Sequence, residues 1–227
     1  PTREDIDTIN ERCLVSPNHV PPSEIQFATY YNKDRDATNS AIFEKYCETY
    51  GTARGPLFQD AIIVFMDQIE MRDASKTYTH VRSNAMLKWI YSNLGEDSCK
   101  FGDGNNRRVD PVLKLYYNCP MMHTANSNIR NGQANGSRVF LEKVRVKSGE
   151  QAVVLRLQSG VFVRAFFASQ IKSITLRHEP TDIEPNTFDV EVECFTFKAK
   201  VDVGGQDEIS HMKGWQFPII SNSVTTG

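Results

Sequence analysis

The stretch LKLYYNCPMMHTANSNIRNGQANGSRV, residues 113–139, joins an apolar run, a Pro-Met-Met step, a polar loop and the start of a basic segment. It contains five asparagines and two glycines. Asn and Gly tolerate left-handed backbone conformations, and short amide side chains can pair with phosphates or base edges. The composition therefore favours a loop that holds a polymer close to its backbone. The alternative is an ordinary surface loop between two strands.

The 227 residues are enough for one large domain or two small ones with a sizeable core. Hydrophobic residues make up 40% of the chain and charged residues 24%, which is typical of a folded protein and excludes a disordered one. No apolar run approaches the roughly 18 residues of a membrane span, so we expect no membrane partner. The chain opens on Pro1 with a polar segment unlike a signal peptide, and we therefore expect a fragment.

The five cysteines are widely spaced, their number is odd, and no C-x-x-C motif occurs. This pattern argues against a disulfide framework and a zinc site, and it indicates a reducing compartment, nuclear or otherwise intracellular. No Ser/His/Asp, Cys/His or paired-carboxylate arrangement supports an unrelated enzyme. We therefore predict no catalytic residue and no metal ligand in this chain.

Charge is unevenly distributed along a chain whose net charge is only −2. Residues 137–178 hold eight basic and two acidic side chains, a net charge of +6. A basic patch on a nearly neutral chain is a plausible footprint of a polyanion. The alternative is a plain solvated surface.

The order of expected elements up to residue 108 favours an α/β fold. Hydrophobic periodicity predicts helices over 2–14, 32–50 and 79–94, a strand over 24–31, and a buried strand of a parallel sheet over 60–67. Ala37, Ala41, Ile42, Phe43 and Tyr46 supply the expected apolar stripe of the middle helix. Residues 16–23 and 95–108 are expected to be a linker and a polar loop.

After residue 137 the chain becomes β-rich, with five short segments separated by turn signals. Five short strands predict a small closed barrel over 137–206. Residues 204–214 are hydrophilic and are expected to connect the barrel to a last buried strand over 215–224. We therefore predict one α/β domain, residues 1–136 plus 207–227, with the barrel inserted into it.

Four segments follow one another along most of the chain: FATYYNKDRDATN (27–39), VDPVLKLYYNCPMM (109–122), NIRNGQANGSRV (128–139) and FPIISNSVTTG (217–227). In this order they resemble the second motor half of superfamily 1 DNA helicases. The nearest group is the petite-integration-frequency class, related to RecD and to Helitron helicases. This resemblance implies an incomplete second RecA-like domain of the P-loop NTPase fold, with helices around a parallel sheet and an inserted SH3-like β-barrel.

The chain departs from the family pattern in three places. It has no G-x-x-x-x-G-K-[ST], and Gln68 follows Asp67 where the family has an Asp-Glu pair. Val139 stands where the family's Asn-Gly-x-x-Gly has its second glycine. The chain stops at Gly227, before the family's His-Lys-x-Gln-Gly segment. The resemblance thus implies ATP and Mg²⁺ as cofactors of the parent enzyme, none bound by this fragment alone, and no hydrolysis by the fragment alone.

The family's first element, T-[RN]-x(6–7)-N, fits this chain in two places. One begins at Thr2 and ends at Asn10, and the other begins at Tyr31 and ends at Asn39. We prefer the second, because an expected strand precedes it and an expected helix follows. Open α/β sheets place ligands at the carboxyl ends of their strands.

The implied function is the C-terminal motor-domain portion of an ATP-dependent DNA helicase of repair or recombination, which grips single-stranded DNA during translocation and unwinding. Its partners would be that strand and the first RecA-like domain of the same parent chain. The alternative is a non-catalytic nucleic-acid- or protein-binding module from a degenerate mobile-element protein. Candidate nucleic-acid-binding residues are Asn32, Arg35, Asn39, Thr124, Asn126, Asn131, Gly132, Asn135, Gly136, Arg145, Lys147 and Arg156.

Some of these candidates have a plainer interpretation. Arg35 and Asn39 can be ordinary residues of a helix surface. Arg145, Lys147 and Arg156 can each be a solvated strand residue. The sequence alone leaves both interpretations open.

Overall fold

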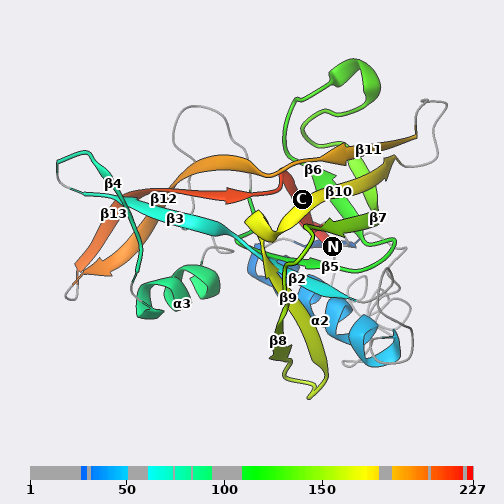
Figure 1. Cartoon of the computed structure of the whole chain (residues 1–227), viewed down its shortest axis with the longest axis horizontal. Helices are drawn as coiled ribbons and strands as arrows, with labels where there is room; N and C mark the ends of the chain where they lie inside the picture. The colour runs from blue at the N-terminus through cyan, green and yellow to red at the C-terminus, as the bar shows by residue number, and fades with distance from the viewer. Residues whose placement is uncertain are drawn as a thin grey trace, which may run out of the picture.

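The computed structural model describes residues 27–29, 32–50, 61–73, 75–82, 84–93, 109–178, 186–203, 206–221 and 224–226. Within them, two α-helices accompany mixed β-sheets, so the described part is an α/β structure (Figure 1). The helix expected over 2–14, the linker over 16–23 and the loop over 95–108 lie outside these residues. Among the described helices, none has the length and apolar character needed to cross a membrane.

Helix α2 spans Asn32–Tyr50, the bounds that the sequence predicts. Its packed side carries Ile42, Phe43 and Cys47, which recur at helical spacing and are buried. Tyr46 stacks on Tyr116, with 4.5 Å between the ring centroids. Burial of these side chains packs α2 against the segment that contains Tyr116.

Two helix predictions need correction. The expected apolar stripe of α2 included Ala37 and Ala41, which are exposed, because the larger side chains define the packed side. The helix expected over 79–94 is shorter, since α3 spans Asn84–Asn93. Before it, β4 (Tyr78–His80) pairs with β3 (Asp67–Arg72) in a local hairpin, so the start of the expected helix is extended instead.

The largest sheet has five strands in the order β11-β10-β7-β6-β14. Its strands are β6 (Pro120–His123), β7 (Arg138–Val146), β10 (Ile171–His178), β11 (Thr187–Val190) and β14 (Ile219–Ser221). All four pairings in it are antiparallel. The loop of residues 124–137, here called the polar loop, leaves this sheet between its adjacent strands β6 and β7.

Two four-stranded sheets and one strand pair complete the described structure. One sheet, in the order β5-β2-β9-β8, consists of β2 (Ile62–Phe65), β5 (Val112–Leu115), β8 (Val153–Arg156) and β9 (Phe162–Phe167). The other, in the order β12-β13-β3-β4, adds β12 (Glu193–Val203) and β13 (Gln206–Gln216) to β3 and β4. The strand pair is β1 (Phe27–Thr29) with β15 (Val224–Thr226).

Parallel pairing is confined to two places in the described structure. β1 runs parallel to β15, and the buried strand β2 runs parallel to β9, while the other nine strand pairings are antiparallel. The expected buried strand near residues 60–67 is therefore present, but the expected parallel sheet is wrong for most of the described strands.

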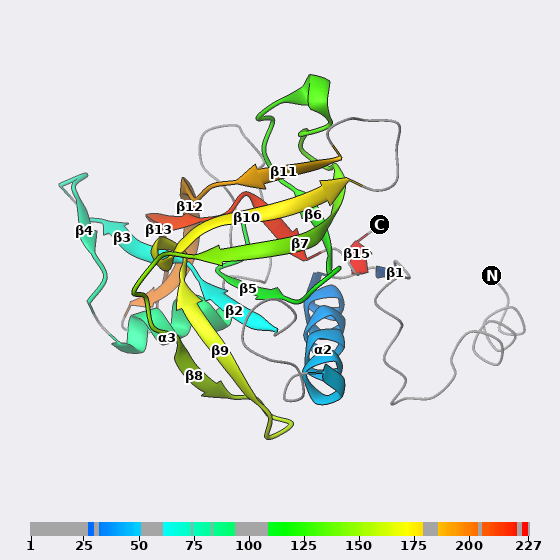
Figure 2. The same cartoon turned by 45° about the vertical axis from the view of Figure 1, so that its right-hand side comes forward.

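The described residues of 137–206 form no closed barrel, which corrects the sequence-based expectation. Their strands are shared among three sheets: β7, β10 and β11 lie in the sheet of β6, β8 and β9 lie in the sheet of β2, and β12 and β13 lie in the sheet of β3. Figures 1 and 2 show the long β12–β13 hairpin reaching away from β6 and β7. The expected connector over 204–214 is mostly strand β13. The division into two domains stays a prediction.

Two apolar clusters hold the described sheets together. The main cluster joins α2 to the five-stranded sheet and to β2, β5 and β9. The second cluster includes Met66, Ile90, Phe197 and Met212, and joins α3 to the sheet of β12 and β13. Between them lies Gln216, fully buried, whose Nε2 donates to the Asp110 carbonyl at 3.1 Å. The main cluster packs the strands from which the polar loop leaves, and it therefore anchors the loop.

Candidate nucleic-acid interface

The polar loop between β6 and β7 is closed at its neck by backbone hydrogen bonds. The His123 amide donates to the Ser137 carbonyl at 2.9 Å, and the Gly136 amide donates to the His123 carbonyl at 2.8 Å. Gly136 has a φ of +92°, a conformation that side chains with a Cβ rarely adopt. The chain therefore leaves and re-enters the sheet at one fixed point.

The tip of the loop has its own hydrogen-bonded structure. A short 3-10 helix, η1 (Ile129–Asn131), ends at Gly132, whose φ is +75°. The Gln133 amide donates to the Asn128 carbonyl at 2.9 Å and closes the tip. The left-handed glycine conformations that the composition indicated are thus confirmed at both glycines of the loop. A loop held in this way presents its side chains from a fixed backbone.

The predicted loop residues divide into exposed and supporting positions. Asn131, Asn135 and Gly136 are exposed. Asn126 is also exposed, but its Oδ1 accepts the Asn135 amide at 2.8 Å, so it holds the loop shape. Thr124 is only 1% exposed. Its amide donates to the Pro218 carbonyl at 2.8 Å, so Thr124 is packed at the neck of the loop rather than presented at its tip. Its nucleic-acid contact stays a prediction that this burial disfavours.

Helix α2 carries the second group of predicted residues. Asn32 and Arg35 lie in its first turns, and their side chains are outside the described structure. Asn39 is 9% exposed, so it does not belong to the open helix surface. It lines a cavity of about 240 Å³ together with Asp36, Ser40, Asp110 and Lys114, among other residues. The interpretation of Asn39 as a plain surface residue is therefore wrong.

Lys114 is the cation of this cavity. Its Nζ donates to Ser40 Oγ at 2.7 Å. Burial lowers the pKa of Lys114, while the charges of Glu44, Asp110 and Asp36 act in the opposite direction. The ammonium is thus already balanced by carboxylates of its own chain.

Of the basic-segment cations, Arg145 is paired. Its guanidinium lies 2.6 Å from Asp189 on β11. A hydrogen bond from Thr175, followed by the charge of Arg145, lowers the pKa of the Asp189 carboxyl. Because the Asp189 carboxylate offsets its charge, Arg145 should attract a polyanion less strongly than the sequence suggested.

Lys147 and Arg156 are exposed, as Arg145 is, but they differ from Arg145 in their pairing. Within the part of the chain that the structure describes, neither forms an ion pair. Figures 1 and 2 place the polar loop and β8, which carries Arg156, at opposite ends of the molecule. The predicted residues therefore form separate groups, and a ligand touching both ends has to be an extended polymer.

The free energy of unfolding at low pH should depend on the ion pair between Asp189 and Arg145. The folded-state pKa of Asp189 is lowered, so its stabilisation is present above its unfolded pKa of about 3.9 and is lost as pH falls through the folded value. We expect Asp189→Asn to reduce the loss of stability between about pH 5 and pH 2. Urea unfolding at several pH values measures this. If Asp189→Asn loses as much stability as the wild-type chain on acidification, the assigned pair is wrong.

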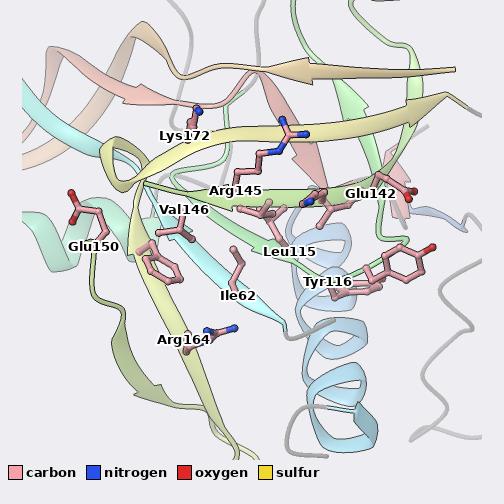
Figure 3. A pocket seen from close by; sticks show the side chains of 14 residues that line it. Ile62, Leu115, Tyr116, Glu142, Arg145, Val146, Glu150, Arg164 and Lys172 are labelled. Atoms are coloured by element: carbon pink, nitrogen blue, oxygen red, sulfur yellow. The ribbon is translucent and has the colours of Figure 1, made fainter. Parts of the chain in front are cut away.

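A cavity of about 580 Å³ lies between the five-stranded sheet and the sheet of β2, β5 and β9. Ile62, Leu115 and Phe166 belong to its apolar wall, and Lys143, Arg164 and Lys172 bring positive charge to it, opposed by Glu142 and Glu150. In Figure 3, Arg164 projects from β9 into the space beside Ile62. The cavity combines an apolar wall with a mainly cationic rim.

Sequence reasoning missed Arg164 as a site residue. The segments QAVVLRLQ (151–158) and GVFVRAFFA (160–168) have a β-rich pattern, but the pattern alone does not fix their mutual register. Aligning the two segments across their Gly-containing turn would have placed Arg164 on the same face as Arg156. That alignment is the signal that could have revealed it.

No family model matches the chain, and no curated protein matches it. It is similar to solved structures of Pif1 helicases. One, from Bacteroides in complex with ADP-AlF3 and ssDNA, has 13% identity and a TM-score of 0.40, with 100% of this chain and 36% of that chain covered. Another, from Candida albicans, has 16% identity and a TM-score of 0.43, with 97% of this chain and 39% of that chain covered. The chain thus spans little more than a third of the length of these helicases, and likeness at this level does not establish a family.

Proposed function

We propose that this chain is the C-terminal motor-domain portion of an ATP-dependent DNA helicase, with a RecA-like core, and that it grips single-stranded DNA. The succession of four family-like segments supports this. The main support for DNA binding comes from the polar loop, residues 124–137. Hydrogen bonds within the loop fix its backbone, and Asn131, Asn135 and Gly136 are exposed on it. The division into two domains belongs to the proposal as well.

The polar loop suits a contact that is independent of base sequence. Asn131 and Asn135 offer amide donors that can bind phosphate oxygens, and the glycines let a backbone approach closely. Lys147 and Arg156 add exposed positive charge away from the loop. Phosphate contacts fix the position of a strand without reading its bases, as a translocating motor requires.

ATP belongs to the proposal only through the parent enzyme. The sequence contains no Walker A motif. The cavity at α2 is a poor fit for a triphosphate, because Asp36 and Asp110 line it and Lys114 already donates to Ser40. No catalytic step is therefore assigned to residues of this chain.

Substituting both exposed loop amides tests the grip. We expect Asn131→Ala with Asn135→Ala to weaken binding of a single-stranded oligothymidylate several-fold, because an ordinary hydrogen bond has a net contribution of about 0.5–1.5 kcal/mol and two are lost. Fluorescence anisotropy at several salt concentrations measures the affinity, which should also fall steeply with salt.

Asn84→Ala is the matched control, since Asn84 is an exposed asparagine on α3, outside the loop. It should leave the affinity unchanged. Equal affinity of the loop double variant and the wild-type chain would refute the assigned grip, and absence of any oligonucleotide binding by the wild-type chain would refute the proposed function.

A second candidate is a non-catalytic binding module from a degenerate mobile-element protein. The predominance of antiparallel pairing favours it, because a motor core is built on a parallel sheet. The parent reading frame distinguishes the two. A Walker A motif upstream and a His-Lys-x-Gln-Gly segment after Gly227 would support the motor.

A further inference from the structure

One face of the β8–β9 hairpin alternates apolar and cationic side chains. In the antiparallel register Val154 lies opposite Arg164, and Arg156 lies opposite Phe162. Opposite residues share a face, and so do residues two apart on one strand. These four side chains, Val154, Arg156, Phe162 and Arg164, therefore form one surface, here called the hairpin face.

The hairpin face is open, whereas the reverse side is packed along β9, although Val153 of β8 is 52% exposed there. Phe162 is 62% exposed and Val154 is 63% exposed. On the reverse side, Val163 and Ala165 are buried in the main cluster. Because the hairpin is already anchored by its reverse side, the exposure of a phenylalanine on the hairpin face is not needed for folding.

The two arginines flank Phe162 in different directions. A Cβ added at Gly160, in the turn of the hairpin, would lie 3.7 Å from a guanidinium nitrogen of Arg156, so that cation lies over the turn. On the other side, Arg164 reaches the cavity of about 580 Å³. Phe166, next in the same row of β9, is buried in that cavity's wall. The row thus leads from an exposed aromatic ring past a cation into an apolar cavity.

We propose that the hairpin face is a second contact for single-stranded nucleic acid, in which a base stacks on Phe162 and the flanking phosphates contact Arg156 and Arg164. It rests on the proposed function, because it extends the bound strand beyond the polar loop. Proteins that bind single strands without sequence preference combine cations along the backbone with aromatic rings that stack bases. The arginine guanidinium also suits phosphate geometry.

A nucleic acid fits this surface better than an acidic polypeptide does. A carboxylate-rich peptide would pair with the arginines but would leave Phe162 without an apolar partner. A hydrophobic peptide would cover Phe162 and Val154 but would bring no charge to the arginines. A single strand supplies a planar ring and anionic groups in alternation, which matches the order of the side chains.

The experiment compares an oligothymidylate with an abasic oligonucleotide of the same length and charge. We expect Phe162→Ala to weaken binding of the oligothymidylate about 5- to 100-fold, the range for loss of one stacked base. Binding of the abasic probe should stay unchanged, since it has no base to stack. Phe162→Tyr should keep the wild-type affinity for both probes, because a ring remains. Fluorescence anisotropy measures the wild-type chain and both variants.

Phe167→Ala is the matched control. It removes an exposed phenylalanine of the same strand whose side chain lies on the reverse side, 6.2 Å from Phe65 between ring centroids. It should not alter binding of either probe. An equal loss for both probes in Phe162→Ala would overturn the stacking role, and so would polyglutamate displacing oligothymidylate at equal charge concentration.

The outcomes also separate this inference from the function on which it rests. If the wild-type chain binds oligothymidylate and the loop double variant weakens it, while Phe162→Ala does not, only the hairpin face is refuted. If the wild-type chain binds neither probe, both proposals are refuted together.

Discussion

Replacing Lys147 and Arg156 together by glutamine is expected to weaken binding of single-stranded DNA about 10- to 100-fold at roughly 50 mM salt. Each phosphate contact on a single strand contributes about 0.7 to the slope of log affinity against log salt, through counterion release. Losing two contacts should therefore flatten that slope by about 1.4. The two cations were chosen because both are exposed and neither forms an ion pair among the described residues.

A second double variant separates local contact from net charge. Arg82 and Lys88 are an exposed arginine and an exposed lysine near and on α3, outside the basic segment. Changing both to glutamine alters net charge equally, and we expect little change in the salt slope. If both double variants flatten the slope to the same extent, the effect is one of overall charge, and the assignment of Lys147 and Arg156 is wrong. Anisotropy titrations at four or more salt concentrations measure it.

Phe217→Ala is expected to lower the free energy of unfolding by about 3–5 kcal/mol. Phe217 has 0% exposure and belongs to the main cluster. It directly follows Gln216, whose Oε1 accepts the Phe217 amide at 3.1 Å. Truncation leaves a cavity where β13 turns into β14, so the loss combines the transfer free energy of the ring with the cost of the void. For a chain of this size the melting temperature should fall by about 6–20 °C.

Phe162→Ala is the control for this prediction, because it removes the same ring from an exposed position. It should change the free energy of unfolding by about 0.5 kcal/mol or less. Urea unfolding followed by circular dichroism measures both variants. A small effect at Phe217 would show that the main cluster does not stabilise this junction. A small effect at Phe162 also confirms that its binding phenotype does not come from unfolding.

Local sequence signals predicted the parts of the site that depend on neighbouring residues only. The bounds of α2 agree because its buried residues recur at helical spacing. The composition of the polar loop indicated left-handed positions, and Gly132 and Gly136 occupy them. The accessibility of Thr124 and Asn39 could not be predicted, because burial depends on which segments pack over them.

The sequence by itself determined the bounds of α2, the presence of the buried strand β2 and the β-rich character of the chain after residue 137. These properties follow from side-chain periodicity and backbone sterics within a few residues. Only the tertiary structure decided which strands pair, so that β7, β8 and β12, expected in one barrel, lie in three sheets. It also decided that Arg145 meets Asp189 and that Phe162 shares a face with Arg156. The physical reason is that alternation defines the two faces of a strand but not its partner, which is set by long-range register and packing.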